Sequence, residues 1–430
     1  MDLITLLLFC STLLVCIIFD ISIVYALIAG FIIFVAYGLY KGFSLSELLK
    51  ESLSGIKTVK NILITFVLIG SLTALWRASG TIPFIVSYAS KLITPSIFLL
   101  MTFLLNCMVS FLIGTSFGTA ATMGVICATM GATMGVNPVM VGGAVLSGTF
   151  WGDRCSPIST SALLVSELTK TDIYDNIKQM FKTSMIPTIL TCIIYAVIGF
   201  TLKSNGEVIN LEALFGTEFN LHILTLLPAI AVLGLASFKV NVKKSMLVSI
   251  IISIPICLFI QNIPFADVLK LIVMGYTAKS AELTDIISGG GITSMIRVIF
   301  IVCISSSYSG IFRKTGLLEG IKKVIAKLNK STNSFVTTLV TSFLADMIAC
   351  NQTLAILLTH QLCGDLYEDN KEFAITMEDT VVVTAPLIPW SIASGAPLTS
   401  IGAPAASIVF AFYLMILPAW RAILSLKKKN

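Results

Sequence analysis

Two short segments that interrupt long apolar runs combine groups able to bind a small cation or carry a proton. In residues 114–119 (GTSFGT), glycine loosens a helix, and hydroxyl groups with freed carbonyls supply the hard oxygen ligands that suit sodium. In residues 151–160 (WGDRCSPIST), Asp153 stands beside a glycine and ahead of a Ser-Pro step. An ionised carboxylate there neutralises a cation, and its protonated form carries a proton. The structural alternatives are close helix packing by small residues and an interfacial Asp153–Arg154 pair.

A third polar segment lies in the second half of the chain. Asp346 stands in an otherwise apolar stretch and is followed by Asn351, Gln352 and Thr353. A polar group left unpaired at membrane depth costs several kcal/mol. That cost favours a functional role for the carboxylate of Asp346.

The fourth polar segment, residues 384–397, is a Pro- and Ser-rich break that includes Ser391. Its proline and serine residues indicate a broken helix with exposed backbone groups. The acidic pair just before it, Glu378 and Asp379, is interpreted as the outer end of a membrane span. The break itself is the favoured candidate site, and the sequence leaves a functional role for the acidic pair open.

Arg77, in the sequence ALWRASG, is unusual inside an apolar run. Its guanidinium group could pair with Asp153 or another buried carboxylate, or bind the carboxylate of a substrate. A third interpretation is that the side chain reaches the membrane interface. The sequence leaves the three open.

The chain that carries these segments has the composition of a membrane protein. Of its 430 residues, 56% are hydrophobic and 12% are charged, and the mean hydropathy is +0.97. Soluble domains carry about 25% charged residues. At roughly 20 residues per span, we expect ten to twelve membrane-spanning helices. The net charge of +6 comes from basic residues in short loops, which is how topology is encoded, and it does not indicate nucleic-acid binding.

The sequence lacks the signatures of soluble enzymes and of ATP-driven pumps. It has no GxSxG, P-loop or dinucleotide-binding fingerprint. Its 10 cysteines show no CxxC spacing and are interpreted as buried apolar residues rather than a metal or redox site. We therefore expect no enzyme activity and no cofactor, with ion gradients as the driving force.

Lysine and arginine in the loops predict the orientation of the chain. Residues 41–61 and 312–331 are rich in basic residues and are assigned to the cytoplasm, whereas residues 203–221 and 364–372 are mainly acidic and are assigned outside. Both termini are then cytoplasmic. We expect a multi-pass protein of the cell (plasma or inner) membrane.

The two halves of the sequence can be laid on each other. Residues 109–125 align with 341–357, and residues 150–164 align with 385–400. The loops beside matching elements differ in charge, which predicts two repeats of inverted topology with broken or re-entrant helices. The expected fold class is an all-α polytopic membrane protein. We expect an extra N-terminal helix at 1–20, a first repeat at 21–203, an external linker at 204–221 and a second repeat at 222–430.

The motifs GTSFGTAATMG (114–124), SGTFWGDRCSPISTSALL (147–164) and EDTVVVTAPLIPWSIASG (378–395) resemble those of the NhaC family of sodium/proton antiporters. The resemblance is good over about residues 110–200 and 340–410. It implies exchange of sodium for protons, or of organic solutes coupled to these ions. The family commonly has a second carboxylate where this chain has Thr160, which leaves the coupling stoichiometry open.

Residues and resemblance together give one set of site candidates. The residues expected to bind the ion or the substrate are Thr115, Ser116, Thr119, Asp153, Ser156, Ser159, Asp346, Asn351, Thr353, Ser391 and Arg77. Among them, sodium ligands are expected at Asp153, Thr119, Asp346 and Asn351.

We predict a secondary active transporter that works by alternating access, with sodium/proton antiport as the leading function. In this prediction sodium binds the broken helices, and a proton on Asp153 or Asp346 displaces it. The alternative is sodium- or proton-coupled transport of a small organic anion or amino acid. A channel or a membrane scaffold is a second rival. The expected partners are sodium, the proton and the lipid bilayer; a homodimer stays open.

Overall fold

The computed structural model describes residues 2–427 except Asp20, Ser90, Leu92, Ile93, Ile158, residues 202–210, Lys239 and Leu318. Every regular element among the described residues is a helix, and β-type pairing there is limited to one isolated bridge between Tyr276 and Gly289. The expected all-α class is confirmed. Residues 204–210 of the predicted external linker lie outside the described residues.

Among the described residues, eleven α-helices precede residues 202–210. They are α1 (Asp2–Ile18), α2 (Ile23–Tyr40), α3 (Leu45–Thr58), α4 (Lys60–Ala78), α5 (Thr81–Ala89), α6 (Pro95–Ile113), α7 (Ser116–Thr119), α8 (Val125–Thr133), α9 (Pro138–Cys155), α10 (Thr160–Thr169) and α11 (Ile173–Thr201). A π-helical segment, Ala120–Gly124, joins α7 to α8 without a break. Such segments are frequent at functional sites.

The remaining α-helices among the described residues follow residues 202–210. They are α12 (Leu211–Gly216), α13 (Leu227–Ser237), α14 (Val242–Phe259), α15 (Phe265–Met274), α16 (Ala281–Ile287), α17 (Ile296–Thr315), α18 (Glu319–Ser331), α19 (Ser334–Ala349), α20 (Gln352–Cys363), α21 (Asn370–Asp379), α22 (Val381–Thr384), α23 (Ile392–Ile401) and α24 (Phe412–Lys427).

Five of the described helical stretches are long and apolar enough to cross a membrane: α4, α6, α11, α14 and Ile292–Phe312, which contains most of α17. The pair Asn370–Leu387 and Ile392–Ile401, bent by 54°, makes a sixth if it is counted as one span. Shorter apolar helices of 10–17 residues occur as well, in α1, α2, α13 and α19. The ten to twelve spans expected from hydropathy are thus not all present as single long helices, because breaks divide several apolar segments.

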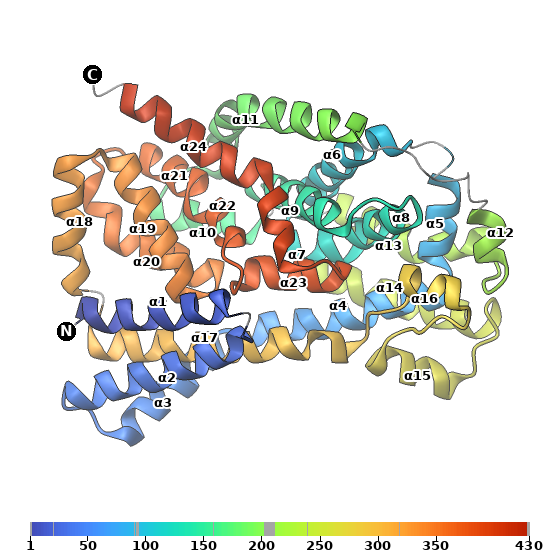
Figure 1. Ribbon diagram of the computed structural model, residues 1–430, viewed down its shortest axis with the longest axis horizontal. Coiled ribbons are helices and arrows are strands. Elements are labelled where there is room, and N and C mark those ends of the chain that lie inside the picture. Colours follow the sequence, from blue (N-terminus) through green and yellow to red (C-terminus); the bar gives the residue numbers. More distant parts are fainter. Residues whose placement is uncertain are drawn as a thin grey trace.

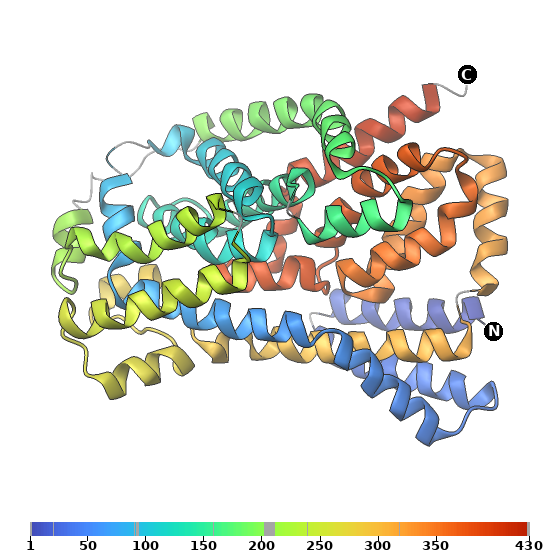
Figure 2. The same cartoon turned by 180° about the vertical axis from the view of Figure 1, so that it is seen from behind.

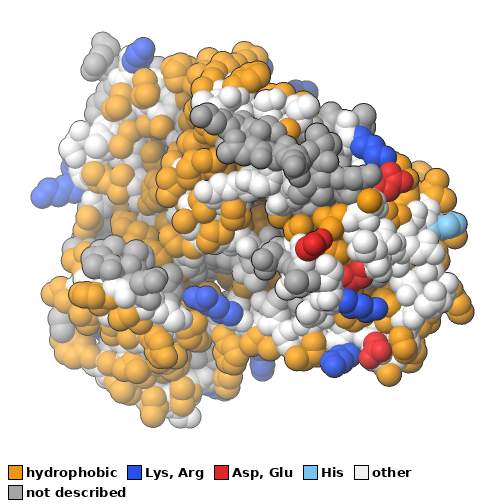
Figure 3. Space-filling view, turned by 45° about the vertical axis from the view of Figure 1, so that its right-hand side comes forward, with side chains coloured by type: hydrophobic (Ala, Val, Ile, Leu, Met, Phe, Trp, Pro, Cys, Tyr) orange, Lys and Arg blue, Asp and Glu red, His pale blue; other side chains and the backbone are white. Residues whose placement is uncertain are grey.

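The helices form two long sides with broken helices between them. Figure 1 shows α1, α2, α4 and α17 along one side and α11 and α24 along the other, with α7, α9, α22 and α23 between. Seen from behind, the α13–α14 pair runs beside α4 (Figure 2). Hydrophobic side chains cover much of the surface in the view of Figure 3, and charged ones are few. That surface suits a lipid environment.

The packing in one half recurs in the other. α2 and α3 pack against α17, and α14 and α15 pack against α4 in the same way. α6 packs against α9 in the first half, and α19 packs against α21 and α22 in the second. Contacts between the halves recur as well, because α10 contacts α21 and α23 contacts α9. Each half therefore contributes helices to the partner half, and the broken helices of both halves meet near the centre of the molecule (Figure 1).

α6 and α9 approach so closely that their backbones are nearly in contact. A Cβ added at Gly148 would lie 2.5 Å from the carbonyl oxygen of Phe103, and one added at Gly152 would lie 2.5 Å from the amide nitrogen of Phe111. Only glycine permits this approach. The contact fixes the last turn of α9, in which Asp153 follows Gly152 directly.

Candidate ion-binding site

Two helix breaks share the same backbone geometry. α6 ends at Gly114 in the left-handed region (φ 69°, ψ 30°), and Thr115 is extended (φ −157°, ψ 131°) before α7 begins. α19 ends at Cys350 (φ 54°, ψ 11°), and Asn351 is extended (φ −147°, ψ 123°) before α20 begins. Each break leaves carbonyls of the first helix and N–H groups of the second without partners inside the helices. Such groups can bind ions.

The hydrogen bonds at the breaks show which residues correspond. The N–H of Gly114 donates to the carbonyl of Ser110 at 2.7 Å, and the N–H of Cys350 donates to the carbonyl of Asp346 at 3.0 Å. Asp346 therefore occupies the position of Ser110. The sequence overlay had placed it opposite Gly114, one helical turn away. The left-handed residue is glycine in one half and cysteine in the other, so the sequence carried no marker for the correct register.

Asp153 lies buried in the last turn of α9, where both breaks of the first half meet. Its Oδ1 accepts a hydrogen bond from the hydroxyl of Ser159 at 2.7 Å. Ser116 interacts with the same carboxylate through its hydroxyl and its backbone N–H. Ser116 begins α7, and Ser159 is the N-cap of α10, 2.8 Å from the hydroxyl of Ser161. Three of the candidate residues, Asp153, Ser116 and Ser159, therefore lie together in the structure.

Arg154 points away from Asp153 into a separate buried network. Its Nη2 forms an ion pair with Asp379, and both side chains are fully buried. The same guanidinium donates to Thr183 at 2.8 Å and to Ser184 at 2.5 Å. Asp379 also accepts from Arg421 Nε at 2.7 Å. The interfacial Asp153–Arg154 pair considered from the sequence is thus wrong, because Arg154 is bound to α11, α21 and α24 instead.

Glu378 is fully buried, and both of its carboxylate oxygens lack a hydrogen-bond partner. Asp153, Arg154 and Asp379 lie close enough to interact with it electrostatically. Burying an ionised carboxylate without a partner is prohibitively costly, so the group requires a proton or a bound cation. The interpretation of Glu378 and Asp379 as the outer end of a span is also wrong, since both side chains are inaccessible.

These groups leave one charge to be balanced. Asp153, Arg154 and Asp379 all interact electrostatically with Glu378, and Arg421 forms an ion pair with Asp379. When all five groups are ionised, the cluster carries a single net negative charge. One sodium ion or one proton neutralises it.

Asp346 forms a second buried acidic position. Its Oδ2 accepts from the hydroxyl of Thr384 at 2.6 Å, and its Oδ1 has no partner. Ser342, one turn earlier on α19, donates to Thr380, the N-cap residue of α22, at 3.1 Å. In the described part of the chain, no hydrogen bond joins Asp346 to Asp153.

The other predicted residues mainly serve the backbone. Ser156 donates to a carbonyl at the end of α6 at 2.7 Å, and Thr119 donates to a carbonyl one turn earlier at 2.9 Å. Asn351 and Ser391 cap α20 and α23 through their side-chain oxygens. Thr353 is exposed and lies outside the buried sites. In the part of the chain that the structure describes, no hydrogen bond joins any two of the four residues predicted to bind sodium.

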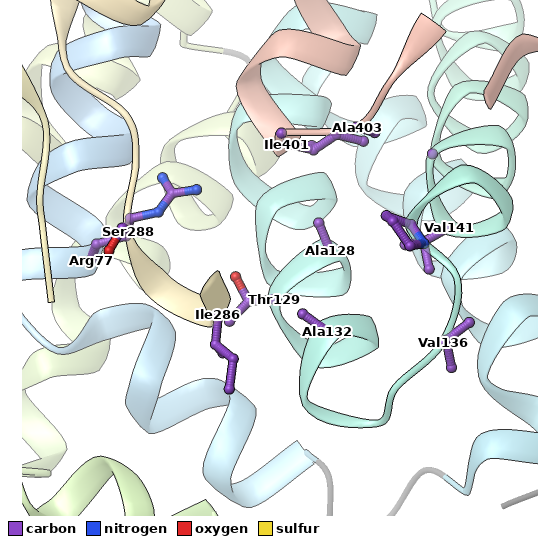
Figure 4. Close-up of a pocket in the computed structure, with 13 residues that line it drawn as sticks. Arg77, Ala128, Thr129, Ala132, Val136, Val141, Ile286, Ser288, Ile401 and Ala403 are labelled. Atoms are coloured by element: carbon purple, nitrogen blue, oxygen red, sulfur yellow. The ribbon is translucent and has the colours of Figure 1, made fainter. Parts of the chain in front are cut away.

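Arg77 lies apart from the acidic residues. Its Nη1 donates to the carbonyl of Thr73 at 3.0 Å, and its Nε is buried without a partner. Among the described side chains it forms no ion pair, so the predicted pairing with Asp153 is not present. It lines a cavity between α4 and α8 (Figure 4).

Sequence reasoning favoured a structural role for Glu378 and included Thr384 only as part of the break at residues 384–397. The signal for Glu378 was that the acidic pair is separated from the apolar run VVV (381–383) by Thr380 alone, which places acids close to a buried segment. No group of three or more His, Cys, Asp or Glu side chains arranged for a metal was found among the described residues. The donors near Asp153 are hydroxyl, carbonyl and carboxylate oxygens, which suit a hard monovalent cation as cargo.

Comparison with known proteins agrees with this chemistry. The family model described as the Na⁺/H⁺ antiporter family matches residues 2–168 and 162–426. The malate-2H⁺/Na⁺-lactate antiporter of Bacillus subtilis is 27% identical over 383 residues, covering 86% of this chain and 82% of the relative. The arginine/ornithine antiporter ArcD of Halobacterium salinarum is 28% identical, covering 84% and 77%. The Na⁺/H⁺ antiporter NhaC of Alkalihalophilus pseudofirmus is 26% identical, covering 91% and 87%.

Proposed function

The chain belongs to the Na⁺/H⁺ antiporter family, and we propose that it exchanges sodium ions for protons across a membrane by alternating access. One observation carries this proposal for the site. Asp153, which accepts a hydrogen bond from Ser159, interacts electrostatically with Glu378, a fully buried carboxylate whose oxygens have no hydrogen-bond partner. These two carboxylates would supply the negative charge that binds one cation.

Sodium would bind at Asp153, with the hydroxyl oxygens of Ser116 and Ser159 as further ligands. Both hydroxyls already interact with this carboxylate, so their oxygens are near the ion position. Glu378 would hold the proton in the other half of the cycle. With all its groups ionised, the cluster carries one net negative charge, so binding sodium at Asp153 and a proton at Glu378 together would leave it with a net positive charge. Sodium binding therefore expels the proton, and proton binding expels sodium.

Arg154, Asp379 and Arg421 hold the site without taking part in the exchange. Asp379 is bound by both arginines and so stays ionised through the cycle. Their role is to fix α9, α21 and α24 around Asp153 and Glu378.

The fold would consist of two repeats of inverted topology, which supports alternating access. The shared geometry at Gly114 and Cys350 supports this, as does the recurring packing of the helices. The α1–α2 pair corresponds to α13–α14, so we place α1 within the first repeat, which then runs from α1 to α11. The loop charges would put both termini in the cytoplasm of a plasma-membrane protein.

Exchange can be measured in proteoliposomes that contain an acidic buffer and a pH-sensitive dye. Sodium added outside should make the lumen alkaline, and potassium should not. Asp153→Asn should abolish the response. Glu167→Gln is the matched control, because Glu167 is an exposed carboxylate on the neighbouring α10. A full sodium response from Asp153→Asn, or no response to any cation in the parent, would show the proposal to be wrong.

A further inference from the structure

Arg77 is a buried cation without a counter-charge among the described side chains. Only 6% of the residue is exposed, and its one described hydrogen bond is donated to a carbonyl of its own helix, that of Thr73. The Nε atom is buried and has no partner. An unpaired buried guanidinium is costly, and the cost is removed when an anion accepts its N–H groups. The Na⁺/H⁺ site near Asp153 makes no use of this residue.

The guanidinium group faces a cavity of about 340 Å³ between α4, α8 and the end of α23 (Figure 4). That volume is at the lower end of the range of about 300–1,000 Å³ for sites of small molecules. Most of the wall is small and apolar. It includes Ala128, Ala132, Val136, Val141, Ile401 and Ala403.

The polar groups of the cavity are few. Thr129 faces it from α8, and its hydroxyl donates to a carbonyl at 2.9 Å, which leaves the oxygen lone pairs free to accept. Ser288 accepts from the N–H of Ala278 at 3.0 Å. Arg77 is the only charged residue among the described residues that line the cavity.

The backbone segment beside Arg77 is itself fixed by hydrogen bonds. Gly289 lies alongside it, since a Cβ there would lie 3.7 Å from Nη2. The backbone at Gly289 is paired with Tyr276, and the N–H of Gly291 donates to the carbonyl of Gly70 on α4 at 2.8 Å. The hydrogen bond from Nη1 to the carbonyl of Thr73 orients the guanidinium beside this segment before any ligand arrives, which favours binding.

We propose that this cavity binds a short aliphatic monocarboxylate, with its carboxylate on Arg77 and its carbon chain against the small apolar residues. This goes beyond exchange of sodium for protons. A guanidinium binds a carboxylate through two parallel N–H bonds. A dicarboxylate would leave its second charge unpaired, and an amino acid would leave its ammonium group without a carboxylate, because the described lining offers neither partner.

The test is equilibrium binding of radiolabelled L-lactate and propionate to the purified full-length protein. Succinate and L-arginine serve as competitors. The parent should bind monocarboxylates saturably, and succinate and arginine should compete at least about tenfold more weakly. Arg77→Gln should weaken binding by at least about tenfold, and Arg77→Lys should weaken it less.

Two further variants separate the site from folding. Ala128→Leu leaves Arg77 in place and fills the cavity, so it should also abolish binding. Arg297→Gln, at an exposed arginine of α17, should bind like the parent. Absence of saturable binding by the parent, or unchanged binding by Arg77→Gln, overturns the proposal. The sodium-dependent pH response of the same preparation reports on the exchange function separately, so either proposal can fail alone.

Discussion

Arg154 and Asp379 form an ion pair in which both side chains are fully buried, although 225 positions separate them in the sequence. Arg421 binds the other oxygen of the same carboxylate. Removing one partner of a buried pair leaves the remaining charge uncompensated. Asp379→Asn should therefore reduce the free energy of unfolding by about 3–5 kcal/mol.

The measurement is thermal or denaturant unfolding of the detergent-solubilised protein. Glu372→Gln changes an exposed acid on the same α21 helix and should leave the midpoint unchanged. Equal midpoints for the two variants would contradict a structural role for Asp379.

Glu378→Gln should separate stability from transport. The substitution replaces an unpartnered buried carboxylate with a neutral group of similar shape, so the unfolding midpoint should stay the same or rise. Sodium-dependent alkalinisation of proteoliposomes should be lost, since glutamine cannot release a proton. Exchange at the parental rate would remove Glu378 from the mechanism.

Ser159→Ala should raise the sodium concentration needed for half-maximal exchange. The hydroxyl lies 2.7 Å from Asp153, and loss of one hydrogen-bonding oxygen costs about 1 kcal/mol, or roughly a fivefold change. Ser159→Thr keeps the hydroxyl and should restore most of the affinity. A failure of Thr to rescue would assign the effect to the helix cap instead.

External pH should change the apparent affinity for sodium. If the same carboxylates hold either sodium or a proton, raising the pH removes the competitor. The half-saturating sodium concentration should then fall by up to about tenfold per pH unit while protons compete. Glu378→Gln should flatten this dependence. Measured exchange with a half-saturation independent of pH would show that the two ions use different groups.

Gly152→Ala should damage the fold, because its Cβ would lie 2.5 Å from the amide nitrogen of Phe111 on α6. The free energy of unfolding should fall by about 1–3 kcal/mol or more, since the neighbouring atom belongs to the backbone and cannot move away by a change of rotamer. Gly234→Ala, in α13, meets no atom within 4 Å and should not destabilise the protein. Comparing the unfolding midpoints of these variants tests whether the α6–α9 contact is as close as the structure shows.

Local polarity made much of the site predictable from the sequence. Asp153, Ser116 and Ser159 were identified because polar residues with glycine and proline in an apolar chain indicate a broken helix. Asp346 was identified because a lone acid in an apolar segment is costly.

Long-range partners could not be predicted. Arg154 stands next to Asp153 in the sequence but lies beside Asp379 in the fold, and only the packing of α9 against α21 and α24 determines that choice. Glu378 was interpreted as an interfacial residue because the sequence pattern of an acidic pair at the start of an apolar run is the same whether the pair is exposed to solvent or buried, as it is here. The shared left-handed conformation of Gly114 and Cys350 could not be predicted for a related reason, since it is adopted by a glycine in one half and a cysteine in the other.

The breaks at Gly114 and Cys350 have the same backbone conformation but differ in backbone strain. Glycine adopts the left-handed conformation freely, whereas a residue with a Cβ pays about 1 kcal/mol or more for it. Contacts outside the turn hold Cys350 there, including the N–H of Ile392, which donates to its carbonyl at 2.9 Å. If that bond were broken, the second break would lose a contact that holds its strained residue, whereas the glycine at the first break has no such strain. The two halves of the molecule therefore differ in stored backbone strain, and the break at Cys350 carries the larger share.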